Sequence, residues 1–277
     1  MEIIKNDENF ALLKQVLSVP TKTYQEKLMV DFITKWLDEN NIPWYEDSMH
    51  NIYATKQTDN VEFLPCVISH TDTVHSIDTI NVKEEFLPDA QKNIKLALKA
   101  YNDSGKPTGI GGDDKCGVFA CLSILKQLPN VKAAFFVSEE TGCHGSNAVD
   151  MPFFDNVGYA IQFDAPENWM ISEYCWGTQL FERNSEFFEK CDRVLTESMP
   201  DNREYMKHPY TDIHIIKQKF SFSCINFSIG YYNYHTPNEY VIVDDVYSGM
   251  NIGIKMIQEL GHTKHPFVSN KRKEFWF

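Results

Sequence analysis

Two adjacent aspartates stand at the end of a glycine-rich stretch near the middle of the chain. The stretch 109–117 reads G-I-G-G-D-D-K-C-G and continues directly into an apolar segment with helical spacing. Glycines allow tight backbone turns, and carboxylate oxygens are ligands that divalent cations accept. The stretch therefore predicts a cation-binding loop around Asp113 and Asp114.

A His-x-Asp sequence lies upstream of this loop. His70 directly follows the apolar run 63–69, and Asp72 comes two residues later. A histidine that binds a metal through one ring nitrogen usually has the other nitrogen held by a carboxylate or a carbonyl. Asp72 could orient His70 in this way, although a surface histidine beside a capping aspartate is the alternative for this pair alone.

A pair of neighbouring carboxylates follows another apolar run downstream. Glu139 and Glu140 come one residue after the apolar run 133–137, with Ser138 between the run and the pair, and the strand is predicted over 132–137. Two such side chains point apart, so one can bind a metal while the other takes a proton from water. For the pair alone, the alternative is an acidic helix start that complements the helix dipole.

Two further candidates complete the set. Asp164 ends the apolar run 161–163, and His235 lies among tyrosines in Y-Y-N-Y-H-T-P-N-E. Taken singly, they could be a helix cap and a hydrogen-bonded surface histidine. Two imidazoles and three carboxylates at strand ends suit two divalent ions that share one carboxylate, and nitrogen and oxygen ligands favour zinc, with manganese or cobalt as possible substitutes. The five candidate ligands are His70, Asp113, Glu140, Asp164 and His235.

Apolar runs and helical patterns alternate along the chain and would position these residues. Helices are predicted over 8–19, 24–40, 116–128, 145–148, 185–198, 211–219 and 243–260. Strands are predicted over 42–45, 51–55, 63–69, 132–137, 159–163 and 222–229, with one hairpin around 94–101 in the otherwise irregular segment 76–108. This β-α-β order predicts an open α/β sheet, with the site outside the carboxyl ends of its strands, in a single domain spanning 1–277.

Length and composition limit the possible partners. The chain has 277 residues, 43% of them hydrophobic, and a formal net charge of −13, which excludes a surface for nucleic acid; the short basic run 271–273 is predicted to be a solvated tail. Seven scattered cysteines and no signal-like or membrane-spanning segment favour a soluble cytoplasmic protein without a membrane partner. We expect a monomer or a small homo-oligomer.

The motifs H-T-D-T-V, G-D-D-K-C-G, S-E-E-T-G, F-D and H-T-P-N-E-Y, in this order, resemble the metal-site motifs of the two-zinc exopeptidases. This family includes peptidase T, the glutamate carboxypeptidases and the single-domain zinc aminopeptidases. The resemblance extends from about His70 to Glu239. It implies an α/β fold, a three-layer α-β-α sandwich with a central mixed sheet of the zinc-exopeptidase (phosphorylase/hydrolase-like) type.

The resemblance also implies a role for each matching residue. His70 and Asp164 would complete one zinc site, Glu140 and His235 would complete the other, and Asp113 would bridge the two. Asp72 would orient His70, and Glu139 would be the general base. The family further implies a cis peptide bond between Asp113 and Asp114.

One departure from the family concerns a lid or dimerisation domain. In peptidase T-like relatives this domain lies between the equivalents of Asp164 and His235, but residues 165–234 must also supply part of the catalytic sheet. The organisation is therefore similar to that of the single-domain zinc aminopeptidases. Oxyanion stabilisation that a lid would provide must come from elsewhere, and the candidates are Tyr210, Tyr231, Tyr232 and Tyr234, for which core packing is the alternative.

These observations predict a metal-dependent amide hydrolase that acts on small peptides or acylated amino acids. Glu139 would take a proton from the attacking water and pass it to the leaving amine. An exopeptidase of the aminopeptidase type is the first expectation, because the acidic net charge favours an amine-terminal substrate. A carboxypeptidase, a dipeptidase, an N-acyl amino acid deacylase, or a catalytically inactive binding protein on the same fold are the alternatives.

Overall fold

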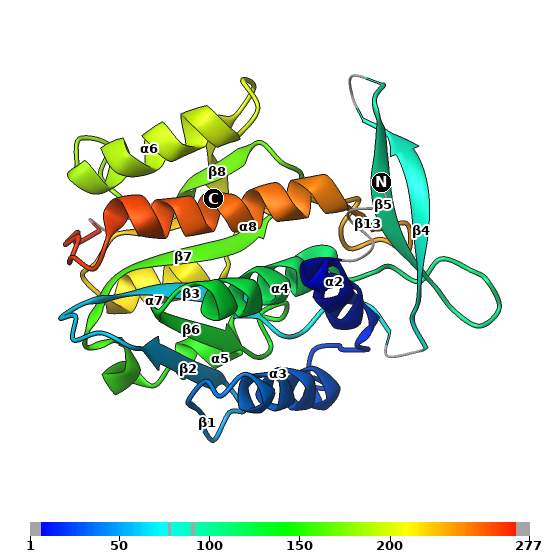
Figure 1. Ribbon diagram of the computed structural model, residues 1–277, viewed down its shortest axis with the longest axis horizontal. Coiled ribbons are helices and arrows are strands. Elements are labelled where there is room, and N and C mark those ends of the chain that lie inside the picture. The colour runs from blue at the N-terminus through cyan, green and yellow to red at the C-terminus, as the bar shows by residue number, and fades with distance from the viewer. Residues whose placement is uncertain (1–6, 77–78, 90–91, 270–277) are drawn as a thin grey trace, which may run out of the picture.

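Nine strands form one mixed sheet in the computed structural model, which describes residues 7–76, 79–89 and 92–269 (Figure 1). The strand order is β1-β2-β6-β3-β7-β11-β8-β10, and β9 pairs with β8. Strands β6, β3, β7 and β11 run parallel at the centre, and β2 and β8 join them antiparallel on either side. The bounds are β1 Trp44–Glu46, β2 Ile52–Gln57, β3 Leu64–His70, β6 Asn130–Phe136, β7 Val157–Ala165, β8 Met170–Cys175, β9 Thr178–Gln179, β10 Glu204–His208 and β11 Cys224–Ser228.

Helices cover both faces of this sheet. Alternate side chains of β7 show the two faces: Phe163 lies against Gly253 of α8, where an added Cβ would be 2.6 Å from the ring, whereas Gln162 accepts a hydrogen bond of 2.7 Å from the Ile213 N–H of α7. The first layer contains α2 (Glu8–Ser18), α4 (Gly112–Gln127), α6 (Glu186–Ser198) and α8, whose bounds are Val243–Leu260; the second contains α5 (His144–Asn147) and α7 (Asp212–Lys219). The predicted α/β fold with a central mixed sheet is confirmed.

A second, four-stranded sheet stands beside the main body at the right of Figure 1. Its order is β12-β13-β5-β4, with bounds β4 Asn81–Pro88, β5 Ile94–Tyr101, β12 Tyr231–Tyr232 and β13 Tyr240–Ile242. We predicted a hairpin around β5 but not this sheet, because the charged run Lys83–Glu85 gives β4 no apolar alternation. The strand forms because β4 pairs with β5 from end to end. Strands β12 and β13 of the same sheet flank the segment that carries His235.

The sequence-based boundaries hold for some helices and not for others. The last helix, predicted over 243–260, has the bounds of α8. The helix predicted from residue 24 instead begins at Lys27 as α3 (Lys27–Glu39), because Tyr24 has a left-handed backbone with φ of 66°. A 3₁₀ turn, η1 (Met151–Phe154), precedes β7.

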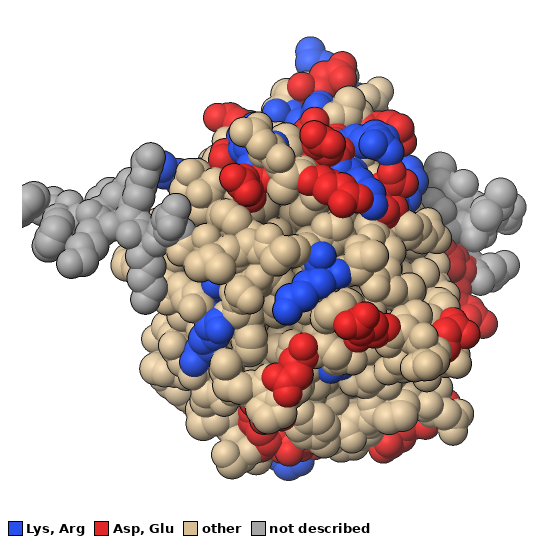
Figure 2. Space-filling model, turned by 90° about the vertical axis from the view of Figure 1, so that its left-hand side faces the viewer, with Lys and Arg blue, Asp and Glu red and all other residues tan. Residues whose placement is uncertain are grey.

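The distribution of surface charge, the state of the cysteines and the character of the helices can be compared with the expectations from the sequence. On the face shown in Figure 2, lysine and arginine side chains lie among aspartate and glutamate side chains. All seven cysteines are buried and unpaired. None of the helices in the described ranges combines the length and apolar character that a membrane span requires. The basic run 271–273 lies outside the described residues.

Candidate metal centre and active site

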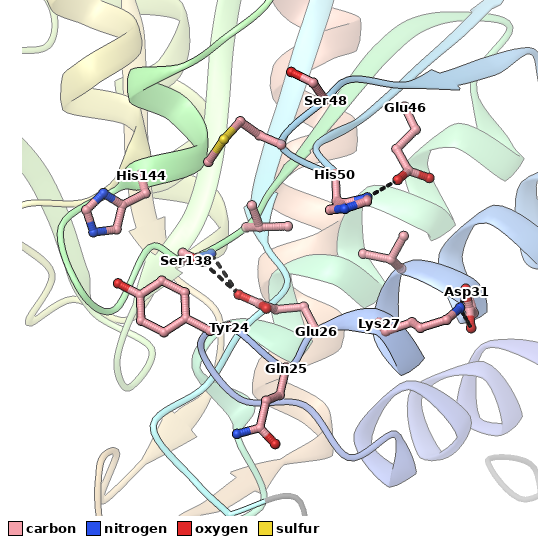
Figure 3. Close-up of a pocket in the computed structure, with 13 residues that line it drawn as sticks. Tyr24, Gln25, Glu26, Lys27, Asp31, Glu46, Ser48, His50, Ser138 and His144 are labelled. Carbon is pink, nitrogen blue, oxygen red and sulfur yellow. Dashed lines mark hydrogen bonds and ion pairs between the residues drawn. The ribbon is translucent and has the colours of Figure 1, made fainter.

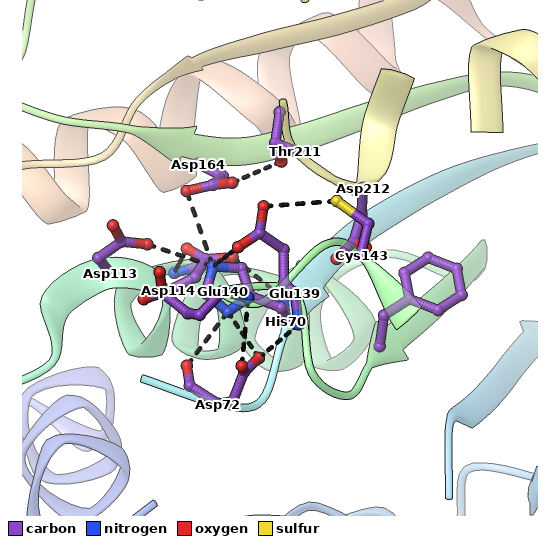
Figure 4. A network of polar contacts seen from close by, with 12 residues as sticks. His70, Asp72, Asp113, Asp114, Glu139, Glu140, Cys143, Asp164, Thr211 and Asp212 are labelled. Atoms are coloured by element: carbon purple, nitrogen blue, oxygen red, sulfur yellow. Dashed lines mark hydrogen bonds and ion pairs between the residues drawn. The ribbon is translucent and has the colours of Figure 1, made fainter. Parts of the chain in front are cut away.

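The predicted ligands converge at the carboxyl ends of β3 and β7, and Figure 4 labels four of them, His70, Asp113, Glu140 and Asp164. His70 is the last residue of β3 and Asp164 is the second-last of β7, and the parallel pairing of these strands places both at one edge of the sheet. Asp113 lies in the first turn of α4, Glu140 follows β6, and His235 lies between β12 and β13. The structure thus brings together five residues that are up to 165 positions apart in the sequence.

The five side chains form two groups that share Asp113. His70, Asp113 and Asp164 offer ligand atoms within 4.8 Å of one another, and so do Asp113, Glu140 and His235. Asp113 Oδ1 lies 3.2 Å from His70 Nε2, and Asp113 Oδ2 lies 3.3 Å from His235 Nε2. Each oxygen of Asp113 therefore faces a different imidazole, as a carboxylate that bridges two cations would.

The charge state of these groups fits cation binding. Burial alone would lower the pKa of His70, but hydrogen bonds with Asp113 and Asp164 hold this pKa well above its ordinary value. Hydrogen bonds with Asp113 and Glu140 raise the pKa of His235 to about 10. Excess carboxylate charge thus keeps protons on both imidazoles, and divalent cations would displace these protons on binding.

Glu140 provides a second sign of a fit. Its Oε2 lies 3.0 Å from His235 Nε2, whereas its Oε1 is enclosed and has no hydrogen-bond partner among the described residues. Burial raises the pKa of Glu140 to about 7. A buried carboxylate oxygen without a partner is costly, and a bound cation would remove that cost. The nitrogen and oxygen donors of the two groups therefore fit two divalent ions.

Asp72 connects the candidate ligand His70 to the two glutamates that follow β6. Asp72 Oδ1 lies 3.3 Å from His70 Nδ1 and accepts a hydrogen bond of 2.9 Å from the Glu139 N–H. Its Oδ2 accepts hydrogen bonds from the Glu140 N–H at 3.2 Å and from Thr23 Oγ1 at 2.8 Å. Asp72 is fully buried and thus fixes the ring of His70 and the backbone of both glutamates.

Glu139 extends into the same site without belonging to either ligand group. Its Oε2 lies 3.9 Å from His70 Nε2, and its Oε1 accepts a weak hydrogen bond of 3.6 Å from Cys143 Sγ. Burial raises the pKa of Glu139 well above its ordinary value, although the charge of His70 opposes this effect. A carboxylate with a raised pKa accepts a proton more readily near neutral pH, as a general base must.

The glycine-rich loop holds Asp113 in place. The peptide bond between Asp113 and Asp114 is cis, which confirms the expectation from the family resemblance. Asp114 accepts hydrogen bonds from the Gly117 N–H at 3.0 Å and the His70 N–H at 3.3 Å. Lys115 donates to two main-chain carbonyls at 3.1 and 3.2 Å. Asp114 and Lys115 fix the loop and lie outside both ligand groups.

Glu239 supports this loop from the opposite side, and sequence reasoning gave it no role. Its carboxylate accepts hydrogen bonds from the Gly111 N–H at 3.0 Å and the Asp113 N–H at 3.1 Å. His75 Nε2 also contacts this buried carboxylate. Glu239 belongs to the H-T-P-N-E-Y motif, so its place in the sequence was the signal that could have found it.

A cavity of about 280 Å³ opens onto the two ligand groups. Tyr210, Tyr231 and Tyr234 line it, and Tyr231 donates a hydrogen bond of 3.3 Å to Asp164 Oδ1. The expectation for Tyr232 was wrong, because its hydroxyl donates to Asp245 Oδ2 at 2.6 Å and its ring stacks on Tyr240, outside the lining. The remaining lining residues are Asp113, Glu139, Glu140, Asp164, Pro166, His208, Pro209 and His235.

A larger cavity, of about 800 Å³, lies behind the segment that carries Glu139 (Figure 3). Glu26 and Ser138 lie in its wall, and Glu26 Oε1 accepts hydrogen bonds from the Ser138 N–H at 3.1 Å and the Ser138 hydroxyl at 2.9 Å. Ser138 has a left-handed backbone with φ of 54°, which is unfavourable for a residue with a Cβ. Glu26 therefore stabilises the left-handed conformation of the residue before Glu139.

Asp212 is a buried carboxylate near Glu139, and its titration gives a testable pH effect. Its Oδ1 accepts a hydrogen bond of 2.5 Å from Ser146, and burial raises its pKa to about 7. In the unfolded chain the same group ionises near pH 4, so stability present at low pH is lost as the pH rises towards 7. We expect Asp212→Asn to stabilise the metal-free protein by about 1–3 kcal/mol more at pH 8 than at pH 5, measured by denaturant unfolding.

The exposed residue Asp201 supplies the matched control for this pH effect. Asp201→Asn removes the same charge from a solvated position and should change the free energy of unfolding equally at both pH values. An equal effect of Asp212→Asn at pH 5 and pH 8 would contradict the raised pKa of Asp212.

A family model and several solved structures match the chain. The model of peptidase family M20/M25/M40 matches residues 66–259, a segment that contains all five candidate ligands, Asp72 and Glu139. No curated protein matches the sequence. The similarity to individual solved structures lies at the level of the fold.

Three similar structures illustrate this likeness. Aminopeptidase PepT from Bacillus cereus is 15% identical, with a TM-score of 0.72, and the match covers 91% of this chain and 98% of that one. A tripeptidase from Staphylococcus aureus is 13% identical, with a TM-score of 0.71, and the match covers 90% and 97%. An aminopeptidase from the archaeon Desulfurococcus kamchatkensis is 11% identical, with a TM-score of 0.66, and the match covers 92% and 96%.

Proposed function

The chain belongs to peptidase family M20/M25/M40, and we propose that it is a dinuclear zinc exopeptidase of the aminopeptidase type. The observation that carries this proposal is the pair of ligand groups that share Asp113, with Glu139 beside them. A buried cluster of carboxylates and imidazoles could also be a structural ion-pair network. The enclosed, unpartnered Oε1 of Glu140 favours the metal centre instead.

We assign the cation sites as follows. His70, Asp164 and one oxygen of Asp113 would hold one ion, and Glu140, His235 and the other oxygen of Asp113 would hold the second. The nitrogen and oxygen donors favour zinc, and manganese or cobalt could replace it. When bound, such ions polarise the scissile carbonyl and make the attacking water more acidic. We propose that the chain works as a single catalytic unit.

The chain's own groups then carry the protons. Glu139 takes a proton from the attacking water as the new C–O bond forms, and it delivers this proton to the amine nitrogen as the C–N bond breaks. Asp72 keeps Glu139 in position through the main-chain hydrogen bond of 2.9 Å. The contact with Cys143 Sγ orients Oε1, which leaves Oε2 on the side of His70.

The charge of the cavity lining supports an aminopeptidase. The ionisable side chains of the lining are four carboxylates, two imidazoles and three tyrosine hydroxyls. They belong to Asp113, Glu139, Glu140, Asp164, His208, His235, Tyr210, Tyr231 and Tyr234. The described lining residues include no lysine or arginine that could pair with a substrate carboxylate. A free amino terminus, by contrast, is attracted by carboxylates. This distribution favours an amine-terminal substrate over the substrate of a carboxypeptidase.

Blocked substrates test this proposal directly. The zinc-reconstituted protein should cleave aminoacyl anilides and C-terminally amidated tripeptides, and N-acetylation of the same tripeptides should lower kcat/KM by at least about 10²-fold. The products are identified by mass spectrometry. If aminoacyl anilides are untouched while N-acetyl amino acids are hydrolysed, the protein is instead a deacylase with the same centre.

Metal analysis supplies the control for these assays. The reconstituted protein should hold about two equivalents of zinc, and its activity should disappear on chelation and return when zinc is restored. Less than about one equivalent after reconstitution would contradict a dinuclear centre.

A further inference from the structure

One imidazole of the cavity wall has no part in the ligand groups. His208 is the last residue of β10 and lines the cavity together with Pro166, Pro209 and Tyr210. The carboxylates of the metal centre line other parts of the same cavity. No motif in the sequence marks His208, because it reaches the centre only through the folding of β10 back onto β8.

The segment that carries His208 is anchored at both ends. The His208 carbonyl accepts a hydrogen bond of 3.2 Å from the Trp176 N–H. Three residues later, Thr211 Oγ1 donates a hydrogen bond of 2.5 Å to Asp164 Oδ2. Pro209, directly after His208, restricts the backbone between these anchors. The backbone segment that carries His208 is thus tied to Asp164, one of the candidate ligands.

The two ring nitrogens of His208 are in different environments. Nδ1 is enclosed and has no hydrogen-bond partner among the described residues. Burial lowers the pKa of His208, and the charges of Asp164 and Asp113 oppose this shift. An enclosed N–H without an acceptor is rarer in proteins than an enclosed acceptor without a donor. A proton is therefore better placed on Nε2, which is not among the enclosed, unpartnered atoms of the described residues.

We propose that His208 is a catalytic residue that donates a hydrogen bond from Nε2 to the carbonyl oxygen of the scissile bond. This inference rests on the proposed function. As the water oxygen attacks the carbonyl carbon, the carbonyl electron pair moves onto that oxygen, and it returns when the C–N bond breaks. A fixed donor stabilises this oxyanion more than the neutral carbonyl, and this difference lowers the barrier.

The tyrosines that line the cavity are less suited to this role. The Tyr231 hydroxyl donates its single proton to Asp164 at 3.3 Å. The Tyr210 hydroxyl lies 3.5 Å from the Glu140 carbonyl, which is the limit of a hydrogen bond. Tyr234 is 45% exposed at the rim, where its ring packs against His235. His208 combines an enclosed Nδ1 with an Nε2 for which the described residues show no hydrogen bond.

Two substitutions of His208 test the proposal. We expect His208→Ala to lower kcat by about 10²–10³-fold, the usual effect of removing one oxyanion donor, with KM changed less than about threefold. His208→Asn retains an N–H donor and should recover part of the loss. Zinc content, measured by elemental analysis, should equal that of the wild type in both variants.

A transition-state analogue separates a catalytic role from a structural one. A peptide phosphinate carries a tetrahedral anionic oxygen in place of the carbonyl, so its affinity should fall in His208→Ala by about the factor lost in kcat. The affinity for the dipeptide product should stay within about threefold of the wild-type value. A merely structural histidine would weaken both ligands together or lower the zinc content.

His262 offers a matched control, since its Nδ1 is also enclosed and unpartnered among the described residues, but it does not line the cavity. His262→Ala should leave kcat unchanged. An active wild type with an equally active His208→Ala variant would overturn this inference alone. A wild type that cleaves none of the substrates would overturn the proposed function and this inference with it.

Discussion

Replacing Glu139 with glutamine is expected to lower kcat by about 10²–10⁴-fold, the contribution of a positioned general base. Glutamine has nearly the same shape as glutamate and keeps an amide oxygen that can accept the weak hydrogen bond from Cys143. It cannot take a proton from the attacking water. Steady-state kinetics on an aminoacyl anilide would measure the loss.

The metal content of this variant decides how the loss is interpreted. Glu139 lies outside both ligand groups, so we expect the variant to bind about two equivalents of zinc, as the wild type should. Glu189, an exposed residue of α6, allows the same substitution far from the centre, and Glu189→Gln should retain full activity. Turnover that persists in Glu139→Gln would exclude Glu139 as the base.

Replacing Asp113 with alanine should have the second large effect, because it should weaken the binding of both metal ions. Each oxygen of Asp113 faces a different imidazole, so Asp113→Ala removes one ligand from both groups at once. We expect zinc to fall from about two equivalents to less than about one, with loss of all measurable hydrolysis. Elemental analysis after dialysis against zinc-free buffer measures the first effect, and the anilide assay measures the second.

The neighbouring aspartate provides a stringent control for Asp113. Burial raises the pKa of Asp114 well above its ordinary value, and both of its oxygens accept main-chain hydrogen bonds. Asparagine keeps only one of these two acceptor oxygens, so Asp114→Asn should lower the stability of the loop. Because Asp114 lies outside both ligand groups, the variant should still bind both ions. If Asp113→Ala loses only one ion and remains active, the shared role of Asp113 is wrong.

Local sequence pattern was sufficient where the relevant contacts are close along the chain. The helix at 243–260 was predicted with the bounds of α8, because its apolar residues repeat with helical spacing. The buried strands β3 and β6 appear as apolar runs, and His70 and Glu139 follow these runs directly or at one residue's distance. The identity of the predicted site residues followed from these positions and from the family resemblance.

Features that depend on distant pairing were not predictable in this way. The strand β4 forms by pairing with β5 despite its charged residues, and the short strand β10 lies at the end of the sheet order. His208 became visible as a cavity residue only after β10 was placed beside β8. Similarly, Thr23 and Glu26 contact Asp72 and Ser138 across gaps of 49 and 112 positions, which no local pattern encodes.

Two glutamates that hold the backbone around the site, Glu26 and Glu239, lie far along the chain from the residues that they contact. Glu26 holds Ser138, 112 positions later, and Glu239 holds Gly111, 128 positions earlier. Contacts between such distant residues form only when the chain between them has been made and has folded. During synthesis on the ribosome, the loop that carries Asp113 therefore lacks its hydrogen bonds to Glu239 until Glu239 has been added to the chain.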